Sequence, residues 1–212
     1  MSPFREAAAA WLAAFGAPDA DPSALGVPFA PATYKEVLDG ALALGRAAGR
    51  LPQAMRVLAE GEARLRRLRD RLGITRRDRG GEGLPRVAVI VQADPLTLAG
   101  RWMPDVVAHA GGRPVLVEAG QPDRAVPWPA LAEADVLVVA PDGREEVEGQ
   151  AVLRALAAHP AWRGHAAVRA GRVAVFEGAL LHRPGPNLVE AAERLAALLH
   201  PEPAEPEGSD RR

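Results

Sequence analysis

The sequence predicts an α/β fold in which a mostly parallel sheet is covered by helices and is preceded by two long helices. Residues 87–91 form the continuous apolar run Val-Ala-Val-Ile-Val, which is typical of a buried parallel strand. Two more short apolar strands are expected at 135–140 and 172–176, with helical segments between them. Strands that alternate with helices in this way favour a parallel sheet with helices on both faces.

The two helices before the sheet are predicted from their caps and apolar stripes. Thr33 and Glu36 have capping-box spacing at the start of a helix over 33–48, which has one apolar face. A second helix is expected over 52–72, where Pro suits the first turn and Gly73 ends the apolar stripe. A helix of that length spans about 30 Å at a rise of 1.5 Å per residue.

The final part of the predicted sheet combines a strand, a stiff turn and a helix. After the strand, the turn His182–Pro186 has little freedom to lose, because proline fixes φ and glycine permits positive φ. Asn187 is expected to cap the last helix, which carries an apolar stripe to Leu199. This order places the turn at the carboxyl end of the sheet, where open α/β proteins usually bind ligands.

Shorter segments complete the expected elements. They are an Ala-rich helix over 3–15, a brief strand at 27–29, a helix over 98–110, a strand at 114–117, a helical turn at 130–134 and a helix over 152–158.

Composition excludes several classes of protein. The formal net charge is −1, so no strong attraction to nucleic acid or to an anionic membrane is expected. Arginines between 64 and 79 form a basic cluster, but acidic residues interrupt it, so we interpret it as a solvated helix face and linker. Cysteine is absent, which excludes disulfides and thiolate metal sites. No apolar run reaches the roughly 18 residues that a transmembrane helix needs.

The sequence also lacks the residue patterns of common catalytic sites. The five histidines show no zinc-ligand spacing. There is no phosphate-binding Gly-rich motif and no nucleophile elbow, and serine occurs only at Ser2, Ser23 and Ser209. We therefore expect a protein that is not an enzyme, with no catalytic cofactor and no metal site.

The run from Val173 to Pro201 resembles the C-terminal end of ABC-importer substrate-binding proteins of the cobalamin and iron-siderophore class, which are helical-backbone metal receptors. It is most similar to the cobalamin-binding branch, whose members end in a strand, a loop, an R-P-G-P-like turn and a final helix; Arg183–Pro186 matches that turn. The likeness extends upstream to about Val27. It implies that the sheet region is the C-terminal lobe of a helical-backbone periplasmic-binding-protein fold, and that the long helices are its connector.

On this resemblance the chain divides into five parts, with most of the N-terminal lobe missing. The division is 1–31 for a remnant of the N-terminal lobe, 32–73 for the connecting helices, 74–85 for a linker, 86–201 for the α/β lobe and 202–212 for a disordered tail.

The resemblance implies several ligand-contacting residues in the loops of the lobe. Trp128 lies between two prolines, in a loop where cobalamin-binding relatives carry a tryptophan against the corrin; otherwise it is a loop anchor. Trp102 lies at an aromatic helix start before a Gly-Gly pair, where it either lines the ligand or packs against the sheet. Gln121 is a candidate polar contact. An aromatic side chain that is already rigid offers stacking area at little entropic cost.

The loop after the last strand supplies the other candidates. Leu181, His182 and Arg183 lie where relatives contact the ligand, although Ala179 and Leu180 replace the polar or aromatic residues usual there. A lone loop histidine is more often inert than a ligand to metal.

Glu133 is the candidate for docking to an importer. Relatives carry an exposed carboxylate shortly after the loop tryptophan, where it pairs with arginines of the permease; an ordinary solvated helix glutamate is the alternative.

The function implied is non-catalytic binding of cobalamin or a related metal chelate, such as another corrinoid, haem or an iron-siderophore. The partners implied are an ABC transporter permease and the chelate, and a homodimer that completes the cleft is a further hypothesis. One alternative is a cytoplasmic single-lobe interaction module that has lost transport function. A second is a metal- or tetrapyrrole-handling enzyme of chelatase-like architecture, although the sequence shows no acid–histidine constellation for it. The resembled family is periplasmic or extracytoplasmic. Residues 5–15, however, lack the layout of a signal peptide, so the chain as it stands is expected to be cytoplasmic. The sequence leaves open whether the short N-terminus is natural or a start-site error.

Overall fold

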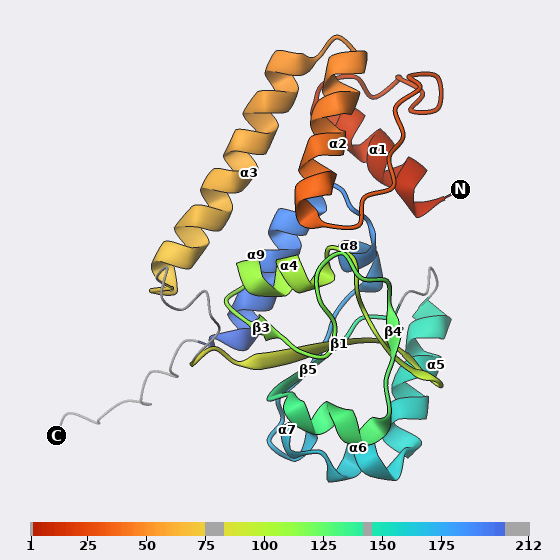
Figure 1. The fold of residues 1–212 in the computed structure, drawn as a ribbon, viewed down its shortest axis with the longest axis vertical. Coiled ribbons are helices and arrows are strands. Elements are labelled where there is room, and N and C mark those ends of the chain that lie inside the picture. The colour runs from red at the N-terminus through yellow and green to blue at the C-terminus, as the bar shows by residue number, and fades with distance from the viewer. Residues whose placement is uncertain (1, 75–82, 142–145, 202–212) are drawn as a thin grey trace, which may run out of the picture.

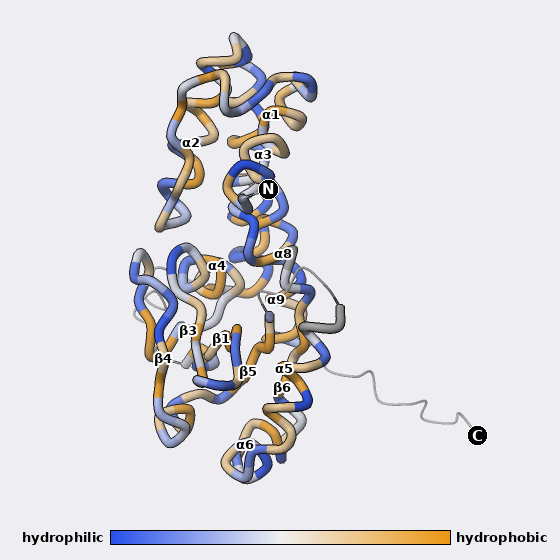
Figure 2. Tube along the Cα trace, turned by 90° about the vertical axis from the view of Figure 1, so that its right-hand side faces the viewer, coloured by the Kyte–Doolittle hydropathy of each residue, from blue (hydrophilic) through white to orange (hydrophobic). Residues whose placement is uncertain are grey.

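The computed structural model describes residues 2–74, 83–141 and 146–201. A helical part made of α1 (Pro3–Ala14), α2 (Tyr34–Ala47) and α3 (Leu51–Arg71) stands on an α/β part (Figure 1). A view turned by 90° shows the same two parts, with α4, α8 and α9 between α1–α3 and the strands (Figure 2). The three expected helices are confirmed.

Local signals account for where α2 begins. The Thr33 hydroxyl accepts a hydrogen bond from the Glu36 amide at 3.2 Å, while the Glu36 carboxylate accepts one from the Ala32 amide at 2.7 Å. These bonds satisfy two amides that the helix itself leaves without partners. The capping box predicted from Thr33 and Glu36 is therefore confirmed, with the glutamate bonding one residue further back.

The expected strand at 27–29 does not form. Val27 and Phe29 instead pack as partly buried side chains against the helical core, and the Phe29 ring lies over Gly40 of α2, which has no Cβ to obstruct it. A short apolar segment far from the sheet has no neighbouring strand to pair with, so it gains more by packing its side chains against the helices than by forming a strand.

Among the described residues the sheet has six strands, of which the central β1, β5 and β6 are parallel. Its path is β4-β2-β1-β5-β6, and β3 also pairs with β1. β3, β5 and β6 run parallel to their partners, whereas β2 and β4 are antiparallel. The bounds are β1 Arg86–Ala93, β2 Leu96–Leu98, β3 Arg113–Pro114, β4 Arg124–Ala125, β5 Val136–Val139 and β6 Val173–Val175.

The helix expected over 98–110 begins later than predicted. β1 turns back into β2, where Leu98 pairs with Ile90, so α4 covers only Met103–His109. Leu98 is 1% exposed in β2, so its side chain is buried in the strand conformation. Pairing of β2 with β1 therefore outweighs the helical periodicity of residues 98–102.

Alternate residues of β1 face two different cores. Val87, Val89 and Val91 point to a core shared with α1–α4 and two later helices, α8 (Gly178–His182) and α9 (Asn187–Leu199). Ala88 and Ile90 point to the other face. That face is covered by the 3₁₀ helix η2 (Trp128–Glu133), α5 (Glu146–Ala158), α6 (Pro160–Gly164) and α7 (Ala166–Arg169). We call these the upper and the lower face of the sheet, as they lie in Figure 1.

The fold class is therefore as predicted: a mixed α/β sheet whose central strands are parallel, flanked by helices and preceded by long helices. The division of the chain into lobes and connector stays a prediction. The expected tail 202–212 and most of the expected linker 74–85 lie outside the described residues.

Candidate ligand-binding rim

The carboxyl ends of β5 and β6 are closed by α8, which sequence analysis had treated as loop. His182 Nε2 donates a hydrogen bond to the carbonyl of Ala140 at 2.7 Å, just beyond β5. At the start of α8, a Cβ on Gly178 would lie 1.9 Å from the Pro141 carbonyl oxygen. The helix can approach the end of β5 this closely only because residue 178 has no side chain.

Trp102 lies beneath α8 and is almost fully buried. The side chain is 4% exposed, and its indole N–H donates to the Leu181 carbonyl at 2.9 Å. The ring meets Phe4 of α1 edge-on, with centroids 6.3 Å apart. Leu181 itself is 0% exposed. Of the two roles considered for Trp102, this burial favours packing, and Leu181 likewise offers its side chain to the core.

Helix α1 lies against the residues that follow α8. Arg183 Nη2 is 3.3 Å from a carboxylate oxygen of Glu6, and the Trp11 indole N–H donates to the Pro184 carbonyl at 2.9 Å. The guanidinium of Arg101 lies 5.7 Å from the centroid of the half-buried Phe4 ring. Phe4, Glu6, Arg101, His182 and Arg183 thus come from three chain segments to one place, which we call the α1–α8 rim.

Gln121 is held beside this rim through the backbone. The Arg101 amide donates to the Gln121 carbonyl at 2.5 Å, and the Gly120 amide donates to the Arg101 carbonyl at 2.9 Å. Arg101 has φ +54°, a left-handed conformation that is unfavourable for a residue with a side chain. At Gly100, any Cβ would lie 2.3 Å from the Gln121 carbonyl oxygen. The exposed Gln121 side chain is therefore placed by a tightly packed pair of loops.

Trp128 does not lie on this rim. It begins η2 on the lower face, where its half-buried ring stacks on His159 with centroids 3.8 Å apart and an interplanar angle of 5°. The turn Arg183–Pro186 lies on the upper face, because its neighbours Leu181 and Leu188 belong to the upper core. The resemblance implied that Trp128 and Arg183 both contact the ligand, but the two lie on opposite faces of the sheet. The physical reason is that the chain passes through antiparallel β4 before η2, which carries the loop to the lower face.

Glu133 is exposed at the end of η2. It lines a groove of about 640 Å³ together with Gln121, Glu118, Arg113 and Arg124. The Arg124 guanidinium donates to the Leu116 carbonyl at 3.1 Å across this loop. Gln121, a candidate ligand contact, and Glu133, the candidate docking residue, thus line the same groove, which is polar and open to solvent.

The histidines serve the fold. The carbonyls of Ala140, Leu131 and Gly111 accept hydrogen bonds from His182, His165 and His200. Among residues 2–74, 83–141 and 146–201, no group of three or more His, Cys, Asp or Glu side chains is placed to hold a metal ion.

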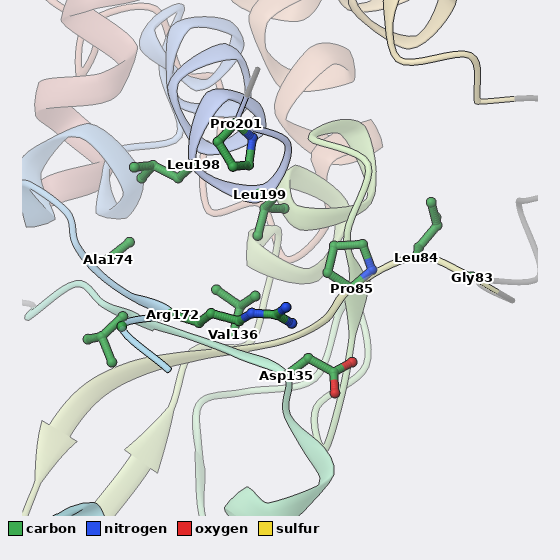
Figure 3. A pocket seen from close by; sticks show the side chains of 12 residues that line it. Gly83, Leu84, Pro85, Asp135, Val136, Arg172, Ala174, Leu198, Leu199 and Pro201 are labelled. Carbon is green, nitrogen blue, oxygen red and sulfur yellow. The ribbon is translucent and has the colours of Figure 1, made fainter. Parts of the chain in front are cut away.

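A second groove of about 730 Å³ lies at the opposite, amino-terminal ends of β5 and β6 (Figure 3). It is bounded by Pro85, Asp135, Arg172 and the end of α9. Ligands of open α/β sheets are met at the carboxyl ends of the strands, so we do not place the site here.

Three rim residues were not predicted from the sequence: Phe4, Glu6 and Arg101. Phe4 stands in an Ala-rich helix near the N-terminus and Arg101 in a loop 97 positions later. Neither Phe4 nor Arg101 has a local pattern that distinguishes it, since only the packing of α1 against Arg101 and Trp102 brings the two together.

No protein-family model matches the sequence. No curated protein is detectably similar to it. Solved structures, however, share its fold. A periplasmic binding protein from Veillonella parvula has a TM-score of 0.65 and 19% identity, covering 78% of this chain and 56% of its own. A periplasmic haem-binding protein from Pseudomonas aeruginosa has a TM-score of 0.69 and 19% identity, covering 92% and 90%.

The chain has the periplasmic-binding-protein fold. A third example is the periplasmic vitamin B12 binding protein of Vibrio cholerae, with a TM-score of 0.58 and 19% identity over 80% of this chain and 62% of that one. The chain spans 56% to 65% of the length of the first four structures it matches. The suspected likeness to binding proteins for cobalamin and iron chelates is confirmed at the level of fold. In the described part of the chain, no helix is both long and apolar enough to cross a membrane.

Proposed function

We propose that this chain is a substrate-binding protein of the ABC-importer type, which holds a metal chelate such as cobalamin, haem or an iron-siderophore without catalysing a reaction. The observation that supports this most is the α1–α8 rim. It lies at the carboxyl ends of β5 and β6, and α1 faces it from the helical part. In the periplasmic-binding-protein fold, as in other α/β folds, this end of the sheet is the expected place for a ligand.

The chemistry of the rim suits a flat ligand with anionic groups. The Phe4 ring supplies an apolar face that is held in place by Trp102. The exposed guanidinium of Arg101 lies over that ring, and the exposed Arg183 pairs with Glu6 of the same helix α1. An aromatic face stacks on a planar ring, and a guanidinium pairs with a carboxylate through two parallel hydrogen bonds. Gln121 would add a polar contact from the loop beside Arg101.

The proposal changes which residues contact the ligand. Phe4 and Arg101 take the place that sequence analysis gave to Trp128, and Trp102 and Leu181 support the rim from below. His182 holds α8 to β5 through the Ala140 carbonyl, so its role is to position Arg183 rather than to bind metal.

The test is a titration with haemin, cyanocobalamin and a ferric hydroxamate siderophore, followed by absorbance and by tryptophan fluorescence. We expect saturable binding of one of them, and about a tenfold loss of affinity in Arg101→Ala and in Phe4→Ala. Arg5→Ala is the matched control, because Arg5 also lies on α1 but pairs with Asp21 away from the rim. Failure of all three chelates to bind would refute the proposal.

For delivery, we propose that Glu133 contacts a cationic side chain of an importer permease. The carboxylate is exposed at the end of a short helix that is held by Leu131, which is 1% exposed. Glu133→Arg should weaken association with the permease in a pull-down, whereas Glu60→Arg on the solvent face of α3 should not. Light scattering on the same samples measures the molar mass and so tests the homodimer hypothesis. A monomeric mass at high protein concentration would exclude it.

A further inference from the structure

A cavity separate from the rim lies where the connecting helices meet the α/β part. It has a volume of about 620 Å³ and opens between α2, α3 and α4. We call it the junction cavity and define it by Tyr34 and Leu38 of α2, Leu65, Arg66 and Arg69 of α3, and His109 of α4. The rim uses residues just before α4, whereas this cavity is lined by Asp105 and His109 within α4, so the two sites share no residue.

The floor of the junction cavity is apolar and well fixed. The rings of Tyr34 and His109 meet edge-on with centroids 4.8 Å apart. Tyr34 is 8% exposed and Leu65 is 2% exposed. The Tyr34 amide donates to an Asp105 carboxylate oxygen at 2.9 Å, which attaches the start of α2 to α4. A rigid floor of this kind loses little entropy when it packs against a ligand.

The two ionisable groups of the floor are uncharged near neutral pH. Burial and the nearby Arg69 lower the pKa of His109 to about 4. Burial, with Glu62 nearby, raises the pKa of Tyr34 to about 12. Arg69 Nη1 lies 3.3 Å from His109 Nδ1. Because a guanidinium can only donate, His109 Nδ1 accepts this hydrogen bond, and the proton of the neutral imidazole is therefore on Nε2.

Charged side chains of both signs line the walls. They are Lys35, Arg66 and Arg69, together with Glu62 and Asp105. Lys35 is paired with Asp39, and Asp105 accepts from the Tyr34 amide. Within the part of the chain that the structure describes, Arg66 makes no hydrogen bond or ion pair, so no described residue competes with an anion for its guanidinium.

We propose that the junction cavity binds a small organic acid, with its carboxylate at Arg66 and Arg69 and its apolar or aromatic body against Tyr34, Leu38 and Leu65. The volume is within the range of about 300–1,000 Å³ that is usual for small-molecule sites. Two guanidiniums at one end of an apolar floor match an amphipathic anion, because each guanidinium can bind a carboxylate with charge-assisted hydrogen bonds. Binding at the junction cavity does not depend on the binding of a chelate at the α1–α8 rim.

The probe for the test is 1-naphthoate, titrated into the full chain by isothermal calorimetry at pH 7.5. We expect saturable binding with a dissociation constant below about 1 mM, and about a tenfold weaker affinity in Arg66→Ala, as expected from the loss of one charge-assisted hydrogen bond. Arg67→Ala is the matched control, because Arg67 is the next residue of α3, is exposed and does not line the cavity. The neutral alcohol 1-naphthalenemethanol should bind more weakly than the acid.

A second variant tests the place of the aromatic body. Leu38→Trp adds volume at a half-buried position of the cavity and should abolish binding of 1-naphthoate, while circular dichroism shows that the chain is folded. The proposal is overturned if the wild-type chain shows no saturable binding, if Arg66→Ala and Arg67→Ala bind equally well, or if folded Leu38→Trp binds like wild type.

Discussion

The burial of Trp102 makes a quantitative prediction about stability. In Trp102→Phe, the indole N–H that donates to the Leu181 carbonyl is lost from a side chain that is 4% exposed. A buried carbonyl that loses its donor costs about 1–3 kcal/mol. The smaller ring also leaves about three atoms' worth of empty space below α8, which costs about 1–2 kcal/mol more. We expect the free energy of unfolding to fall by about 2–5 kcal/mol.

The assay is urea unfolding followed by far-ultraviolet circular dichroism, analysed with a common m-value. For a chain of this size the same loss lowers Tm by roughly 4–20 °C. Trp128→Phe is the matched control, since the same substitution at a half-buried ring on the lower face keeps the stack on His159 and should cost less than about 1 kcal/mol.

Two outcomes would refute this reasoning. One is a loss of stability in Trp102→Phe that is below about 0.5 kcal/mol, which would mean that the indole is not part of the core. The other is unchanged stability with about tenfold weaker chelate binding, which would show that Trp102 contacts the ligand directly.

Three more perturbations test the fold around the two sites. Gly178→Ala should destabilise the chain by more than about 3 kcal/mol or prevent folding, because its Cβ would lie 1.9 Å from the Pro141 carbonyl oxygen; a thermal melt near wild type would contradict this. Folding lowers the pKa of His109 from 6.5 to about 4, so between these pH values the unfolded state binds more protons than the folded state. Stability therefore falls as pH drops, and we expect the free energy of unfolding to decrease by up to about 2 kcal/mol from pH 7.5 to pH 5. This decrease should be absent in His109→Gln. The hydrogen bonds from Arg86 lower the pKa of Asp135 to about 2, so its stabilisation is present above about pH 4 and is lost towards pH 2. Because Arg86 is 44% exposed, Asp135→Asn should cost no more than about 1 kcal/mol at pH 7, and urea melts of both chains should converge at pH 2.

Local patterns predicted the elements that are stabilised locally. Thr33 and Glu36 placed the start of α2, and the apolar run from Val87 to Val91 placed the central strand. Helices and buried strands of this kind are encoded by caps and periodicity, which lie within a few residues of each other. The misplaced start of α4 and the absent strand at 27–29 both depend on whether a distant strand is available for pairing.

The same distinction holds for the candidate site. The sequence predicted the last strand, the following turn and the final helix, and so indicated the segment around Arg183. It did not predict that Phe4 would lie under Arg101, or that Trp128 would stack on His159 on the lower face. These contacts join residues that are far apart in the sequence, and no spacing rule relates them.

By itself, the sequence determined an α/β chain with long leading helices and no catalytic pattern, because propensity, caps and apolar periodicity act over short distances. Only the tertiary structure decided which side chains meet at the carboxyl ends of the strands. That outcome depends on the face of the sheet to which each crossover returns and on the docking of α1 against α8, which are properties of packing between distant segments.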